Sequence, residues 1–94
     1  MNHKAQIQKL ILEVLASNNV DDKRRAGNQA IELFKGAKLI DQTPVAIKMN
    51  TSLELKEAID NFITHDNSIT REALKNSYSF ISQLLHDEKA VSVD

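Results

Sequence analysis

Three histidines, His3, His65 and His86, are the residues most suited to acid–base, phosphotransfer or metal chemistry. Zinc sites place histidines at set spacings such as HExxH, and a phosphotransfer histidine lies exposed in mid-helix beside a lysine and a small residue. These three fall in the N-terminal arm, in a polar turn and near a helix end. We therefore expect ordinary surface histidines and no bound metal.

Neighbouring carboxylates occur at Asp21 with Asp22 and at Glu54 with Glu57. Acid–base catalysis by two carboxylates requires a pocket that moves their pKa values apart. Both pairs have polar neighbours, which favours solvated helix faces and helix starts. Gly-rich phosphate loops and nucleophile elbows are missing as well, so the sequence predicts a protein that is not an enzyme and has no cofactor.

The segment Thr64, His65, Asp66, Asn67, Ser68 is a compact polar turn. Its Asp-Asn-Ser-Ile part is similar to the Asp-Ser-Leu site at which carrier proteins attach phosphopantetheine. An intervening Asn, and a place before the last helix instead of the second, favour a capping turn. Such caps routinely use these residue types.

The run Lys23, Arg24, Arg25 places three cations in the first turn of a predicted helix, where they oppose the helix dipole. Asp21 and Asp22 can offset them. A mixed-charge surface is one interpretation, and a docking patch for an acidic or membrane-adjacent partner is the other.

Composition sets the class of protein. The chain has 94 residues, 41% hydrophobic and 27% charged, which suits one globular domain over 1–94. Its 12 basic residues against 13 acidic ones argue against nucleic-acid binding. It has no cysteine, a polar N-terminus and no apolar run longer than residues 10–12, which predicts no membrane-spanning segment and a cytoplasmic location.

Apolar residues at helical spacing predict four helices, over about 4–17, 20–38, 44–64 and 69–87, followed by a mobile tail over 89–94. With only 2 Gly and 1 Pro, the chain has few turns. The predicted class is all-α, an antiparallel up-down-up-down four-helix bundle. The predicted inner faces comprise Ile7, Leu10, Ile11, Leu12, Val14 and Leu15; Ala26, Ala30, Ile31, Leu33, Phe34 and Ala37; Ala46, Ile47, Leu55, Ala58, Ile59, Phe62 and Ile63; and Leu74, Tyr78, Phe80, Ile81, Leu84 and Leu85.

Helix ends are predicted from capping residues. Asn19 or Asp21 begins the second helix, Thr43 caps the third with Pro44 in its first position, and Ser68 or Thr70 caps the fourth. Residues 50–52 are weak helix formers, and we favour a continuous third helix over a kink or break there. Gly27 can permit close helix approach, while Gly36 marks fraying or an early helix end.

The stretch Thr43-Pro44-Val45-Ala46-Ile47, followed by Asn50, Leu53, Leu55, Ile59, Phe62 and Ile63, resembles the third helix of class II bacteriocin immunity proteins of the enterocin A and lactococcin A type. The small residues Ala26, Asn28 and Ala30 resemble that family's second helix more weakly. The resemblance covers roughly residues 21–64. Several members are basic, whereas this chain is slightly acidic, and the C-terminal quarter does not match.

The resemblance implies a cytosolic four-helix bundle that protects a bacterium from a pore-forming peptide without destroying it. Its implied partner is a membrane permease of the mannose phosphotransferase type in its bacteriocin-bound state, recognised from the inner face of the membrane. The C-terminal half is the implied specificity region. We therefore expect recognition by the turn 64–68 and by the tail that begins His86, Asp87, Glu88, Lys89, with Lys23, Arg24 and Arg25 as a second patch. A generic helical interaction or regulatory module is the alternative, and the sequence leaves the oligomeric state open.

Overall fold

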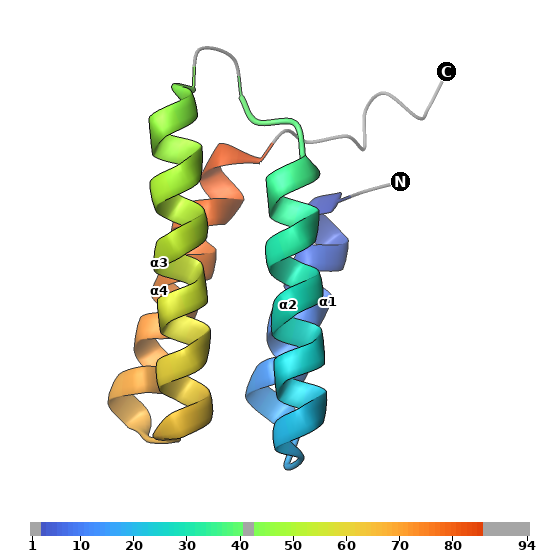
Figure 1. Ribbon diagram of the computed structural model, residues 1–94, viewed down its shortest axis with the longest axis vertical. Helices are drawn as coiled ribbons and strands as arrows, with labels where there is room; N and C mark the ends of the chain where they lie inside the picture. Colours follow the sequence, from blue (N-terminus) through green and yellow to red (C-terminus); the bar gives the residue numbers. More distant parts are fainter. Residues whose placement is uncertain (1–2, 41–42, 86–94) are drawn as a thin grey trace.

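The computed structural model describes residues 3–40 and 43–85, and it is all-helical (Figure 1). Its helices are α1 (His3–Ala16), α2 (Val20–Gly36), α3 (Val45–Thr64) and α4 (Ser68–Leu84). In these two ranges the other regular feature is an isolated antiparallel bridge between Leu39 and Leu85. The all-α prediction is confirmed, and each predicted helix exists. The predicted tail 89–94 lies outside the described residues.

Each helix packs on the next one along the chain, and α1 also meets α4. The turns joining α1 to α2 and α3 to α4 lie at one end of the molecule, whereas the connection from α2 to α3 lies at the other (Figure 1). This order of contacts is what an up-down-up-down arrangement requires.

The core runs along the centre of the four helices. Its largest fully buried side chains come from all of them: Ile7, Val14, Phe34, Leu55, Phe62, Leu74 and Ile81. Leu10, Leu33, Ala58, Ile63 and Tyr78 are half-buried against it. Most of the predicted inner faces are therefore correct, because helical spacing brings residues i, i+4 and i+7 onto one stripe.

Four predicted core residues are wrong: Leu12, Ala46, Ile47 and Phe80 are exposed. In the N-terminal half of α3, the small polar Thr51 and Ser52 occupy the inner face instead. Both can satisfy their hydroxyl groups on the helix backbone, so a core position does not require them to break the helix. The prediction of a continuous third helix is confirmed.

One predicted helix start is correct, and the starts of α3 and α4 need correction. Asn19 caps α2 as predicted, with its side chain accepting from the Asp22 amide at 3.1 Å. Pro44 occupies the cap position of α3, one residue before the first helical turn, and Thr43 instead donates its hydroxyl to the Ile40 carbonyl at 2.8 Å. Pro fits there because the cap residue has an extended backbone and needs no N–H partner inside the helix.

The cap of α4 is Asn67, not Ser68 or Thr70. The Asn67 side chain accepts from the amides of Ile69 and Thr70, both at 2.9 Å, and the Thr70 hydroxyl accepts from the Asn67 amide at 3.2 Å. This reciprocal pair is a capping box with Thr in place of the usual Glu. The prediction that this segment is a capping turn is correct in kind.

Hydrogen bonds to backbone carbonyls close the opposite end of the molecule. The Ile40 amide donates to the Leu84 carbonyl at 2.8 Å, and Lys48 Nζ donates to the Ala37 carbonyl at 3.1 Å. These two bonds attach the segment after α2 to the end of α4 and to the first turns of α3.

Gly27 allows α2 and α3 to approach closely. A Cβ atom at this position would lie 2.7 Å from Cγ2 of Ile59, far inside ordinary contact distance. Ile59 is buried and β-branched, so this methyl group has little freedom to move aside. The predicted close approach at Gly27 is confirmed, whereas Gly36 ends α2 with open space around it.

Gly27→Ala should therefore destabilise the fold, even though Ala is the better helix former. We expect a net loss of about 1–2 kcal/mol, because overpacking outweighs the gain in helix propensity. Chemical denaturation measures it, with Gly36→Ala as the matched control that should be neutral or slightly stabilising. Equal effects of the two substitutions would contradict the close contact.

Partial burial of Tyr78 raises its pKa above the ordinary value of 10.0. The folded state then keeps the phenol protonated at a pH where the unfolded chain ionises, so stability should fall as pH rises beyond about 10. Tyr78 is the only tyrosine, so its ultraviolet titration reports this group alone. Tyr78→Phe should reduce the alkaline loss of stability; an unchanged loss would contradict the shift.

Candidate functional site

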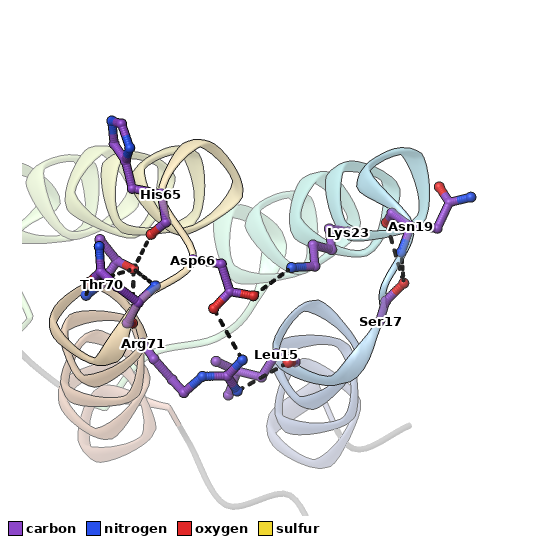
Figure 2. Close-up of polar contacts among 9 residues, drawn as sticks. Leu15, Ser17, Asn19, Lys23, His65, Asp66, Thr70 and Arg71 are labelled. Atoms are coloured by element: carbon purple, nitrogen blue, oxygen red, sulfur yellow. Dashed lines mark hydrogen bonds and ion pairs between the residues drawn. The ribbon is translucent and has the colours of Figure 1, made fainter.

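The structure brings two of the predicted recognition segments together at one end of the molecule. Lys23, in the second turn of α2, lies 3.4 Å from Asp66 in the turn between α3 and α4, measured from Nζ to Oδ2. The two residues are 43 positions apart in the sequence. Figure 2 shows Asp66 between Lys23 on one side and Arg71 of α4 on the other.

Arg71 completes the contact. Its Nη2 lies 3.3 Å from the other carboxylate oxygen of Asp66, and its Nη1 donates to the Leu15 carbonyl near the end of α1 at 3.1 Å (Figure 2). One carboxylate therefore connects α2 to α4, and the guanidinium continues the connection to α1. We call Leu15, Lys23, Phe62, Asp66 and Arg71 the Asp66 clamp.

Phe62 of α3 forms the floor of the clamp. The Lys23 ammonium lies 4.4 Å from the ring centroid and the Arg71 guanidinium 5.0 Å. Cations at this distance are attracted by the negative face of the ring, and more strongly where water is excluded. The ring is fully buried. Because Leu15, Lys23, Phe62 and Arg71 belong to α1, α2, α3 and α4, all four helices contribute to the clamp.

Burial is uneven across the ion pair. The Lys23 side chain is 8% exposed, whereas that of Asp66 is 48% exposed. A lysine withdrawn from water to this degree requires a compensating charge, and Asp66 supplies it while remaining partly hydrated. The pair should thus be stronger than an exposed ion pair and weaker than a fully buried one.

The local sequence explains why Lys23 points inward. It precedes Ala26, Ala30 and Phe34 at the spacing of one helix face, and the cap at Asn19 sets where that face begins. The predicted exposed patch of three cations is therefore wrong for Lys23. Lys23 continues the buried stripe of α2. Its helical spacing to Ala26 could have predicted this burial, but its place in a run of three cations favoured an exposed position.

Arg24 and Arg25 do lie on the surface. Arg25 pairs with Asp22 at 3.1 Å, and Arg24 lies 3.9 Å from Asp60 of α3. All four side chains are about half exposed or more. Such pairs contribute little stability, and they suit both the mixed-charge surface and the docking patch, which stay open as alternatives for Arg24 and Arg25.

The turn between α3 and α4 is exposed from Thr64 to Ser68, but hydrogen bonds to its backbone hold it in place. The His65 amide donates to the Asn61 carbonyl at 2.8 Å, and its carbonyl accepts from the Thr70 hydroxyl. The His65 imidazole points away from the clamp (Figure 2). The turn thus presents polar side chains from a fixed backbone.

The predicted tail residues His86, Asp87, Glu88 and Lys89 lie outside the described residues. The nearest described position is Leu85, which follows α4 at the end opposite the clamp (Figure 1). The 17 residues of α4 separate the two ends by roughly 25 Å, at about 1.5 Å per helical residue.

In residues 3–40 and 43–85, no group of three or more His, Cys, Asp or Glu side chains is placed to hold a metal ion. Within the same ranges, no helix is long and apolar enough to cross a membrane. The clamp is a set of structural ion pairs and hydrogen bonds. Its polar groups are engaged with one another.

No known protein family, curated protein or solved structure matches the chain. Sequence reasoning missed Arg71 and Phe62 as parts of this end of the molecule, because neither stands in a local motif with the residues it contacts.

Asp66→Asn should destabilise the fold by about 1–2 kcal/mol, between the values for exposed and buried pairs, because it leaves the Lys23 charge withdrawn from water without a carboxylate. Thermal unfolding should show a fall of roughly 4–16 °C for a domain of this size. The matched control is Asp60→Asn, which removes the exposed pair with Arg24 and should change stability by less than about 0.5 kcal/mol. Equal effects would show that the clamp contributes no more than a surface pair.

Proposed function

We propose that the chain is a class II bacteriocin immunity protein of the enterocin A and lactococcin A type, which protects by binding and not by catalysis. In this proposal it acts in the cytoplasm, at the inner face of the membrane. It occupies the bacteriocin-engaged permease of the mannose phosphotransferase type and leaves the peptide intact. We also propose the antiparallel up-down-up-down bundle as the fold that carries this activity.

The resemblance over residues 21–64 supports the proposal. Several of the resembling residues lie where α2 and α3 pack together. Leu55, Ile59 and Phe62 of the resembling stretch form the buried face of α3, and Gly27 lets the small-residue face of α2 pack closely against Ile59. These residues therefore account for how α2 and α3 pack together.

The observation that carries the functional part is the exposed turn 64–68, fixed from within by the Asp66 clamp and the capping box. A recognition surface on a fixed backbone loses little conformational entropy on binding, so its side chains can contribute more of their interaction energy to affinity. Arg24, which lies 3.9 Å from Asp60 of α3, adds exposed charge near the end of α3, and Arg25 adds exposed charge at the start of α2.

Expression in a bacteriocin-sensitive strain tests the proposal. A panel of class II peptides is applied to cells that produce the chain, with the empty vector as control. We expect survival against one or a few peptides, because immunity of this kind is specific. No protection across a broad panel, with the protein present at normal levels by immunoblot, would contradict immunity and favour the helical interaction module.

The turn gives a sharper prediction. His65→Ala combined with Ser68→Ala should weaken protection about tenfold or more, because both side chains are exposed at the proposed recognition surface. The free energy of unfolding should change by less than about 0.5 kcal/mol, since neither side chain is in the core. Minimum inhibitory concentrations measure protection and chemical denaturation measures stability.

Lys75→Ala, an exposed change on α4 outside the turn, is the matched control and should leave protection intact. Full protection by the double variant would exclude these two side chains from recognition. Equal loss in both variants would point to a general effect instead of a defined surface.

A further inference from the structure

The N-terminal half of α3 carries a ridge of apolar side chains that the core does not use. Val45, Met49 and Leu53 are 74%, 62% and 61% exposed. They lie at positions i, i+4 and i+8 of one helix, so they form a straight ridge roughly 12 Å long at about 1.5 Å per residue. Soluble proteins seldom expose contiguous large apolar residues without a binding role.

Cations flank this ridge. Lys35 of α2 and Lys48 of α3 line a shallow groove together with Met49, Ser52 and Leu53. Lys35 has an exposed pair with Glu32 at 3.6 Å, and Lys48 donates to the Ala37 carbonyl. An exposed pair of this kind is weak, and a bond to a neutral carbonyl leaves the lysine charge uncompensated.

The helix itself adds to the positive potential. Residues 43–53 include no acidic side chain, and the first turn of α3 has neither an acidic residue nor a side-chain cap. The positive end of the helix dipole is therefore not neutralised from within the first turn. Apolar side chains and positive potential occur together on the same half-helix.

The combination of exposed apolar side chains and lysines favours some binding partners of the ridge over others. A partner helix prefers a deep groove into which its own side chains fit, whereas the groove here is shallow and Val45, Met49 and Leu53 keep most of their surface in water. A second copy would place the lysines of each chain near those of the other unless acidic residues met them. An anionic lipid surface accepts a projecting apolar ridge and attracts the lysines beside it.

We infer that the ridge of Val45, Met49 and Leu53, with Lys35 and Lys48 beside it, docks on an anionic lipid surface. The three apolar side chains enter the boundary between headgroups and acyl chains, and the two ammonium groups contact lipid phosphates. This inference goes beyond the proposed immunity function and does not depend on it, because it requires only lipid.

Co-sedimentation of the purified full chain with vesicles tests it. The probes are vesicles of phosphatidylcholine mixed with phosphatidylglycerol, and vesicles of phosphatidylcholine alone. We expect binding to the mixed vesicles that is roughly tenfold stronger than to the neutral ones and that weakens at high salt. Met49→Glu with Leu53→Glu should lower binding to the mixed vesicles by a further factor of about ten or more, since it places two carboxylates on the ridge.

Leu12→Glu is the matched control, because Leu12 is an exposed apolar residue of α1 outside the ridge. It should bind as the unaltered chain does, and circular dichroism should show that all variants remain helical. Absence of binding to mixed vesicles, equal binding to both vesicle types, or unchanged binding of the double Glu variant would each overturn the inference. So would a dimer in sedimentation analysis that the double Glu variant dissociates without any lipid binding by the unaltered chain.

Discussion

A lysine ammonium withdrawn from water constrains the end of this molecule where α1 is joined to α2 and α3 is joined to α4. Lys23 lies on the inner stripe of α2, and its charge is compensated by a carboxylate from a distant turn. Because an uncompensated charge in such a position is costly, the turn that carries Asp66 is held near the start of α2.

The other contacts at this end of the molecule involve the same pair. Arg71 extends the contact from Asp66 to the Leu15 carbonyl, so α1 is attached to α4 and to the turn that precedes it. Phe62 provides an apolar floor that both cations share. The opposite end is closed differently, by backbone acceptors at Ala37 and Leu84. Ion pairs between side chains thus fix one end, whereas the bonds at the other end are accepted by backbone carbonyls.

Helical periodicity was sufficient to predict four helices and most of the core, because the buried stripes of Ile7, Ala30 and Ile59 repeat at helical spacing. Local chemistry was less reliable at the helix starts: Thr43 and Pro44 can be shifted by one residue without breaking any capping rule, and Asn67 competes with Ser68 for the same role. The clamp could not be predicted, since its contacts span up to 56 positions between Leu15 and Arg71. The burial of Lys23 was also missed, because its place in a run of three cations favoured an exposed position.

The two surfaces considered for binding differ in physical character. The turn 64–68 is polar and supported from beneath by the clamp, whereas the ridge on α3 is apolar and flanked by lysines. Both depend on α3 being held in a fixed position, by the close approach of Gly27 in α2 to Ile59 and by the contact of Lys23 with Phe62 in the clamp.

The most direct test of this account is a double-mutant cycle between Lys23 and Asp66. Lys23→Met removes the buried charge while keeping an apolar stem of similar length, so Asp66→Asn should cost much less in its presence. Chemical denaturation of the four proteins should give a coupling free energy of about 1 kcal/mol or more, within the range observed for contacting residues. A coupling energy near zero would show that Lys23 does not depend on Asp66, and the clamp would not be the constraint that orders this end of the fold.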